Sequence, residues 1–194
     1  MSYQQSEKMA ERKQARRRRF LDAAIALFAR LGYHAATVPM IVREAESSTG
    51  AFYLYFRNKE DVYVAALQEI GARLSGALNH GIASESRPEA RMAAAVRCFV
   101  AWLAENAPEA HILMEAAALG GRMEEARRAI IESHVRSVAV ARCWVGSVLE
   151  AAQGWIALPS TERRDSAALA AVVADFNLRG AGLKDPGTTR WRGN

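Results

Sequence analysis

T-V-P-M-I-V-R-E-A-E-S-S-T-G-A-F-Y-L-Y-F-R-N-K, residues 37–59, contains two short helical patterns joined by a tight polar turn. Thr37 suits the N-cap of the first helix, and Ser48 suits the N-cap of the second, over residues 49–56. The turn between them is Glu46-Ser47. The second helix carries small and aromatic polar residues where a solvated helix would carry charges. Such a helix is suited to lie in the major groove of DNA.

The segments on either side also have helical patterns. Residues 11–31 repeat apolar side chains at three- and four-residue steps, behind a run of arginines, and Gly32 suits the C-cap. Residues 1–11 are expected to form a flexible polar arm. Asn58 suits the N-cap of a longer helix over 59–80, with Asp61 completing a capping-box-like pair.

The remaining sequence predicts further helices and no strands. They are expected over residues 89–105, 108–119, 122–153 and 162–183, with a loop over 154–161 and a disordered tail over 188–194. The fold class is therefore all-α. An N-terminal helix-turn-helix domain is expected over 1–58, and a helical ligand-binding and dimerisation domain over 59–187.

Charge separates the chain into two parts. The net charge is +5, and residues 1–60 hold eleven Lys and Arg against six Asp and Glu, whereas the rest of the chain holds fifteen of each. A basic end beside a neutral remainder indicates a polyanion-binding module with a separate second function. The sequence contains no transmembrane pattern and no secretory signal, so a cytoplasmic protein is expected.

The chemistry of the basic end assigns individual roles. Lys59, the hydroxyls of Thr37 and Ser48, and the phenols of Tyr53 and Tyr55 suit phosphate contacts. Gly50 and Ala51 lack bulk, so the backbone can approach base edges, which Thr49 can then hydrogen-bond. Arginines are expected to reach phosphate, base or the adjacent minor groove, with Arg16, Arg17 and Arg43 as the candidates.

Residues 37–61 resemble the tetracycline-repressor (TetR) family of transcription regulators. The matching order is Thr37-Val38, Ile41, Ala45, Ser48-x-Gly50 and F-Y-L-Y-F-R-N-K-E-D at 52–61, preceded by L-D-A-A-I-A-L-F-A-R-L-G-Y at 21–33. The resemblance covers about residues 12–67, roughly a third of the chain. The sequence departs from the family at three sites: Glu46-Ser47 replaces Gly-Val, Thr49 replaces Lys, and Leu54-Tyr55 replaces Tyr-His. If Glu46 takes a positive φ, as the family's glycine does, the cost is ~1 kcal/mol.

The resemblance implies a homodimeric, ligand-responsive repressor of an inverted-repeat operator in double-stranded DNA. It also implies dimerisation through the last two long helices and a small apolar or amphipathic effector bound between helices of the C-terminal region. Large side chains that could line such a pocket, or belong to plain core, are Met92, Phe99, Trp102, Met114, Trp144 and Phe176.

Other kinds of function find less support in the sequence. A membrane-surface or non-specific nucleic-acid-binding protein that uses the basic first helix is the alternative, although the apolar stripe of this helix is needed for the core. No catalytic or cofactor motif is present, so no enzymatic activity, cofactor or metal site is expected. Cys98 and Cys143 are expected to be reduced thiols.

Overall fold

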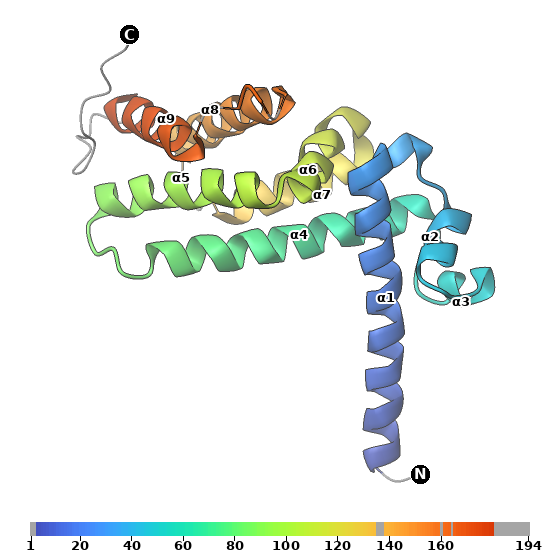
Figure 1. The fold of residues 1–194 in the computed structure, drawn as a ribbon. Helices are drawn as coiled ribbons and strands as arrows, with labels where there is room; N and C mark the ends of the chain where they lie inside the picture. The colour runs from blue at the N-terminus through green and yellow to red at the C-terminus, as the bar shows by residue number, and fades with distance from the viewer. Residues whose placement is uncertain (1–2, 135–137, 160, 164, 181–194) are drawn as a thin grey trace. The chain divides into compact units, whose positions relative to one another are not determined.

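A computed structural model describes residues 3–134, 138–159, 161–163 and 165–180 (Figure 1). Regular structure in these residues is entirely helical, which confirms the all-α prediction. The helices are α1 (Tyr3–Ala35), α2 (Val38–Glu44), α3 (Thr49–Tyr53), α4 (Lys59–Ile82), α5 (Pro88–Glu105), α6 (Ala107–Leu119), α7 (Gly121–His134), α8 (Val138–Ala157) and α9 (Ser166–Gly180). None of the described helices is both long and apolar enough to span a bilayer.

The chain divides into two compact units. Unit 1 contains residues Met1–Ile70 and His111–Arg127, and unit 2 contains Gly71–Ala110 and Arg128–Asn194. Helices α4, α6 and α7 therefore each contribute residues to both units. This division differs from the expected boundary at residue 58, because unit 1 recruits half of α4 and a later helical segment to complete its core.

The core of unit 1 is built on the apolar face of α1. Phe20, Leu27 and Phe28 are fully or almost fully buried, and so are Phe52 of α3 and Tyr63 of α4. The rings pack edge-on, with centroids 5.6 Å apart for Phe20 and Phe52 and 4.8 Å apart for Phe28 and Tyr63. Such aromatic pairs add to the free energy gained by burial. The Phe20–Phe52 pair orients α3 against α1, although α3 has only five residues, and the Phe28–Tyr63 pair joins α4 to α1.

Unit 2 has its own core between α5, α8 and α9. Its buried members are valines and alanines, joined by the partly buried Phe99 and Leu169. A polar link crosses this core: the Ser147 hydroxyl lies 2.8 Å from Asn177 Oδ1, and Asn177 Nδ2 donates to the Val173 carbonyl at 2.7 Å. Cys98 of α5 has no disulfide, and it packs closely against Gly81 of α4.

Several helix limits differ from the sequence predictions. Helix α1 begins at Tyr3 and includes most of the segment expected to be a flexible arm, because that segment consists of good helix formers without Gly or Pro. Helix α3 ends at Tyr53, before the expected Phe56. Helix α9 begins at Ser166 because the Asp165 side chain accepts the Ala167 N–H at 3.0 Å and starts the helix there.

The predicted single helix over 122–153 is assigned as two helices, α7 and α8, and residues 135–137 between them lie outside the described part of the chain. Helix α8 continues to Ala157, into the segment expected to be a loop. The predicted tail over 188–194 also lies outside the described residues.

Candidate nucleic-acid interface

Helix α2 ends at the turn that leads to α3. This end has the hydrogen bonds of a helix that stops at a glycine, although the residue at that position is Glu46. The Ser47 N–H donates to the Val42 carbonyl at 3.0 Å, and the Glu46 N–H donates to the Arg43 carbonyl at 3.1 Å. This is the Schellman pattern, which requires a left-handed residue after the C-cap. Glu46 has φ +47°, and no other described non-glycine residue has a positive φ. The conditional prediction for Glu46 is therefore confirmed: a residue with a Cβ carries the strain that glycine would avoid.

Arg19 of α1 stabilises this turn and so offsets part of the strain at Glu46. Its guanidinium donates to the Ala45 carbonyl at 3.0 Å and lies 3.8 Å from the Glu46 carboxylate. The Ala45 carbonyl is at the C-terminal end of α2, where a cation is favoured by the helix dipole. Arg19 is thus occupied in holding the turn that positions α3.

Both predicted N-caps are present. Thr37 Oγ1 accepts the Met40 N–H at 3.4 Å, and Ser48 Oγ accepts the Ala51 N–H at 3.2 Å. Both side chains are exposed. Because each hydroxyl oxygen accepts the capping bond, its own hydrogen stays available to donate. The remaining N–H groups of the first turn point the same way, although Pro39 leaves α2 with one fewer than α3. Both helix starts can therefore receive an oxygen of a phosphate group.

The outer face of α3 is open to solvent. Thr49 and Gly50 are exposed, and Ala51 is half-buried. A Cβ placed on Gly50 would meet no atom of the protein within 4 Å, so the lack of a side chain there serves no internal packing. Tyr53 is 54% exposed and Leu54 is 74% exposed. The sequence prediction did not include Leu54, although its place one residue beyond an exposed tyrosine could have suggested it.

The inner face of α3 is held by aromatic contacts. Phe52 and Phe56 are buried, and Phe20 lies between Phe52 and Tyr55, with its ring centroid 5.9 Å from that of Tyr55. Tyr55 is half-buried. Tyr53 and Tyr55 therefore differ in role: Tyr53 presents most of its ring to solvent, and Tyr55 combines packing with a reachable edge.

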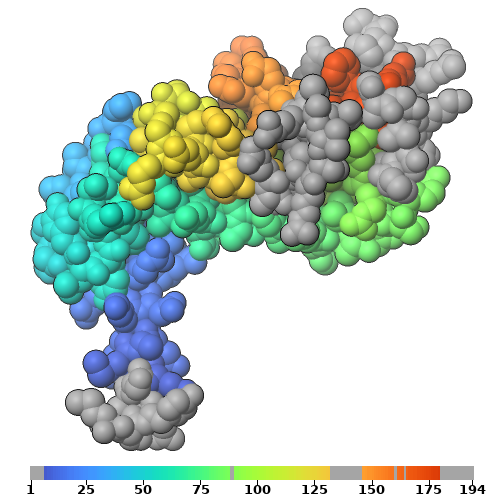
Figure 2. Space-filling model, turned by 180° about the vertical axis from the view of Figure 1, so that it is seen from behind, coloured from blue at the N-terminus to red at the C-terminus, as the bar shows by residue number. Residues whose placement is uncertain are grey.

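The arginines at 16–19 have different surroundings. Arg16 is exposed, as is Arg43 on α2, and neither side chain makes an ion pair or hydrogen bond within the described residues. The Arg17 guanidinium lies over the Phe56 ring, 5.1 Å from its centroid. Arg18 is bound to Asp22 and Glu69, both at 2.8 Å. In Figure 2 the blue N-terminal half of α1 stands clear of the cyan helices on the visible face.

Lys59 makes contacts within the protein. Its ammonium donates to the carbonyls of Tyr33 at 2.7 Å, Ala36 at 3.0 Å and His34 at 3.4 Å, and it lies 4.2 Å from the Tyr33 ring centroid. An ammonium has three hydrogens, so these three carbonyls engage all of them. The predicted phosphate contact is not supported by this geometry. Lys59 instead fastens the start of α4 to the carbonyls that precede α2.

The Glu115 carboxylate of α6 binds the same region, where the chain passes from α1 to α2. The two oxygens of Glu115 accept the Tyr33 N–H at 2.9 and 3.1 Å, and one of them also accepts the Tyr63 hydroxyl at 3.1 Å. The Tyr63 hydroxyl lies 2.9 Å from the Ile112 carbonyl as well. Burial and the nearby carboxylate of Glu115 raise the pKa of Tyr63 well above its usual range. The sequence did not single out Glu115, because its partners lie more than fifty residues away along the chain.

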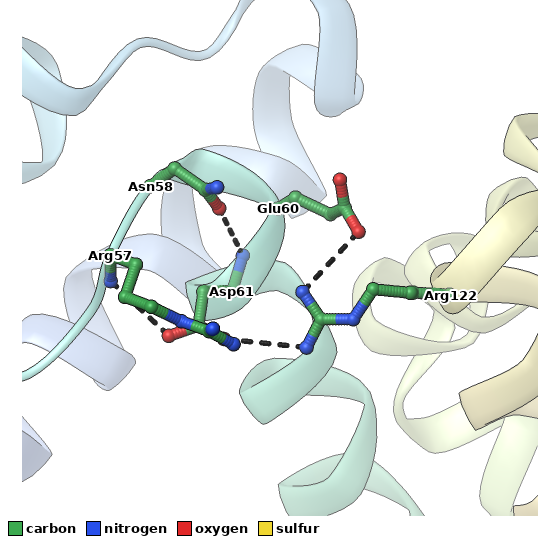
Figure 3. A network of polar contacts seen from close by, with 5 residues as sticks. All are labelled: Arg57, Asn58, Glu60, Asp61 and Arg122. Carbon is green, nitrogen blue, oxygen red and sulfur yellow. Dashed lines mark hydrogen bonds and ion pairs between the residues drawn. The ribbon is translucent and has the colours of Figure 1, made fainter.

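Asn58 caps the first turn of α4 as predicted, whereas Asp61 binds the N–H of Arg57 and not that of Asn58 (Figure 3). Asn58 Oδ1 accepts the Asp61 N–H at 2.8 Å, and the Asp61 carboxylate accepts the Arg57 N–H at 3.2 Å. Arg122 of α7 reaches Glu60 at 3.4 Å and Asp61 at 3.5 Å. Burial alone would raise the pKa of Asp61, but hydrogen bonds and charge from Arg57 and Arg122 lower it overall. Helix α7 is thereby attached to the start of α4.

The proposed pocket residues are distributed over both units. Trp102 is buried, Met92 is half-buried, and Phe99 packs on the core between α5, α8 and α9, all in unit 2. Met114 belongs to unit 1. Phe176 is 67% exposed on α9, a place better suited to a protein contact than to a pocket wall. The side chain of Trp144 lies outside the described residues.

Comparison with known proteins gives a consistent pattern. The model for bacterial regulatory proteins of the tetR family matches residues 20–66. The fatty acid metabolism regulator protein of Bacillus subtilis (strain 168) is 41% identical over 49 residues, which are 25% of either chain. An uncharacterised regulator of the same strain, YdgC, is 29% identical over 182 residues, covering 84% of this chain and 91% of that protein.

A solved structure has the same fold. It is the transcriptional regulator FadR from Bacillus subtilis in complex with stearoyl-CoA, with a TM-score of 0.70, 20% identity, and coverage of 84% of this chain and 97% of that chain. The family model covers only the helix-turn-helix region, whereas the sequence match to YdgC covers most of the chain. The similarity in fold extends over most of the chain.

Proposed function

The chain belongs to the TetR family of bacterial regulatory proteins, and from this premise we propose that it is a ligand-responsive, DNA-binding transcriptional repressor. The observation that carries the proposal is the outer face of α3. Gly50 is exposed and has free space around it, and it lies between two flanking groups, Thr49 and Tyr53, that can donate hydrogen bonds. A helix face without bulk, on a rigid aromatic support, matches what close approach to base edges requires.

The DNA contacts follow from exposure and from free donors. Thr49, Gly50 and Ala51 would meet the bases. Phosphate contacts are proposed for exposed or partly exposed groups that keep a free donor: Thr37, Ser48, Tyr53, Tyr55, Arg43, Arg16 and Arg17. Lys59 is assigned an indirect role, because its donors hold the corner between α1 and α2 and so fix the position of both helices.

A homodimer through α8 and α9 is part of the proposal. Val172 is 46% exposed and Phe176 is 67% exposed, one helical turn apart on α9. Large apolar side chains together on one helix face indicate a surface that another protein covers. A symmetric dimer presents two copies of α3, and this is why the operator should be an inverted repeat.

The effector is proposed to be an apolar or amphipathic small molecule bound in unit 2. Helices α4 and α6 contribute residues to both units, so a shift of either helix on binding would act directly on the Lys59 and Glu115 contacts of unit 1. Binding of the effector to one state would then change the separation of the two α3 helices and release the operator. Stearoyl-CoA, the ligand of the similarly folded regulator, is a suitable first probe.

The experiment is selection of duplexes from a random-sequence library by the full chain at moderate salt. An enriched inverted repeat, bound by a dimer, is the expected result. Recovery of no sequence above the background, or equal binding to all duplexes, would refute the proposal. A vesicle sedimentation control addresses the membrane-surface alternative, which is not favoured because Phe20, Leu21, Leu27 and Phe28 of α1 are buried in the core.

A further inference from the structure

The first helix continues well beyond the helix-turn-helix unit. Helix α1 begins at Tyr3, and the side chains of residues 7–19 are exposed without exception. We use the term basic arm for residues 8–17 of this helix. It carries five cationic side chains in ten residues: Lys8, Arg12, Lys13, Arg16 and Arg17. Figure 1 shows α1 continuing past α2 and α3 on the N-terminal side.

Charge is segregated around the helix. Lys8, Arg12 and Arg16 follow each other at four-residue steps, and Arg19 comes three residues later, so these four side chains share one face. Glu7 and Glu11 lie on a different face, together with Arg18, which is bound to acidic partners. Neither Glu7 nor Glu11 therefore neutralises the cationic face.

Contacts near residue 19 show where the cationic face is directed. Arg19 reaches the Ala45 carbonyl in the turn between α2 and α3. Arg17 lies over Phe56, just beyond the end of α3. Because Lys8, Arg12 and Arg16 share a face with Arg19, they are directed toward the side of α1 from which Arg19 reaches the turn between α2 and α3, whereas Arg17 lies on a different face. At ~1.5 Å per residue, Lys8 lies roughly 14 Å beyond Arg17 along the helix axis.

Like charges within the arm oppose its helical state. Lys8 and Arg12, Arg12 and Arg16, and Lys13 and Arg17 are i,i+4 pairs, and each like-charge pair costs an isolated helix about 0.2–0.5 kcal/mol. No acidic partner of these five side chains occurs among the described residues. A polyanion alongside the cationic face would relieve the repulsion among Lys8, Arg12 and Arg16.

We infer that the basic arm is a second DNA-binding element, which runs beside the duplex and binds phosphates outside the base pairs contacted by α3. This inference rests on the proposed function, since α3 has to be seated in a groove for the arm to reach the flanking backbone. The partner is the phosphate backbone and not a base sequence, because Lys and Arg on one face at four-residue steps offer charge without a shape that reads bases.

The experiment measures the salt dependence of binding to a duplex selected by the wild-type protein. The test variant is Lys8→Gln/Arg12→Gln, and the matched control is Arg87→Gln/Arg97→Gln, which removes two exposed cations from unit 2. Each lost phosphate contact lowers the slope of log K against log salt by ~0.9. The test variant should lower the slope by about 1.8 per protomer, and the control should leave it unchanged.

Two further measurements test the same inference: one uses a shorter duplex, and the other uses a variant that exchanges Lys and Arg and so keeps the charge. On a duplex trimmed to the selected base pairs, the wild type and the test variant should have the same slope, because the flanking phosphates are gone. The Lys8→Arg/Arg12→Lys variant should restore the full slope on the long duplex. An unchanged slope for Lys8→Gln/Arg12→Gln, or a loss limited to binding of anionic phosphatidylserine vesicles, would overturn the inference. In that case α3 could still select a DNA sequence, and the proposed function would stand. The proposed function fails by a different result, namely a library that yields no enriched site.

Discussion

The Glu115 carboxylate of α6 accepts the backbone N–H of Tyr33 through both of its oxygens, at 2.9 and 3.1 Å. Tyr33 follows Gly32, whose φ of +74° ends the regular part of α1. A Cβ on Gly32 would lie 3.0 Å from a Glu115 oxygen, so the glycine makes room for the carboxylate. A helix more than eighty residues away in sequence thus determines how the chain leaves α1 and enters α2.

Replacing Glu115 by Gln should destabilise the protein by about 2 kcal/mol, because hydrogen bonds from Tyr33 and Tyr63 to a charged acceptor are weakened. Urea unfolding measures the loss. The control is Glu125→Gln on α7, an exposed glutamate that should change stability by less than about 0.5 kcal/mol. Equal effects of the two substitutions would show that the Glu115 contacts do not contribute.

Stability should decrease at alkaline pH through Tyr63. Burial raises the folded-state pKa of Tyr63 above its ordinary value of 10.0. The unfolded chain therefore loses the phenol proton first, and the stabilisation is complete below pH 10 and declines as the pH rises further. Tyr63→Phe removes this dependence, which amounts to about 1.4 kcal/mol at pH 11.

The measurement for Tyr63 is urea unfolding at pH 9, 10 and 11. The stability difference between wild type and Tyr63→Phe should narrow over this range, and the exposed Tyr53→Phe variant should run parallel to the wild type. Burial also raises the pKa of Tyr33, so the wild type and both variants keep a smaller common decline. A constant difference for Tyr63→Phe would contradict the prediction.

Glu46→Gly should relieve backbone strain in the helix-turn-helix turn. At φ +47° a residue with a Cβ is strained and glycine is not. The comparison is with Glu46→Ala, which removes the same exposed carboxylate and keeps the Cβ. Glu46→Gly should be more stable than Glu46→Ala by about 1 kcal/mol in urea unfolding. Equal stabilities would mean that the turn relaxes when the side chain is shortened.

Gly50→Ala should separate DNA binding from folding. The added methyl meets nothing inside the protein and raises helix propensity, so stability should stay the same or rise by up to about 1 kcal/mol. Affinity for the selected duplex should fall about tenfold or more, because the methyl occupies space at the base edges, a loss of at least 1.4 kcal/mol. Gly76→Ala on α4 also adds a methyl in open space and should leave affinity unchanged.

Phe176→Ser should weaken the dimer. A buried anchor of this size contributes 2 kcal/mol or more to an interface, so the dissociation constant should rise about thirtyfold. Analytical ultracentrifugation over a concentration series measures it. Met9→Ser is the matched control, since Met9 is 68% exposed on α1, far along the chain from α9. Identical assembly of Phe176→Ser and wild type would place the dimer interface elsewhere.

Local sequence signals identified the helix-turn-helix region residue by residue. Thr37, Ser48 and Asn58 cap the helices they were predicted to cap, and Glu46 has the strained conformation that its position demanded. Caps and tight turns depend on atoms within four residues of each other along the chain, so the sequence contains the information needed to predict them.

The structure changed the predictions for side chains whose partners lie far away in the sequence. Lys59 looked like a phosphate ligand because its charge and place at a helix start favour that role, but the carbonyls of Tyr33 and Ala36 come within reach of its ammonium after folding. The Glu115 contacts have no local signal, since the acceptor and its donors are separated by more than fifty residues. The start of α1, over residues 3–10, was also missed, although its composition favours a helix.

The sequence alone therefore determined that the chain is helical, where its DNA-reading helix begins, and which side chains that helix can offer, because helix periodicity and capping are short-range properties. The tertiary structure decided which cations remain free for DNA, since Arg18, Arg19 and Lys59 are engaged inside unit 1 while Arg16 and Arg43 are exposed without a described partner. A charge is free only when no folded neighbour supplies its partner, and neighbours are set by long-range packing.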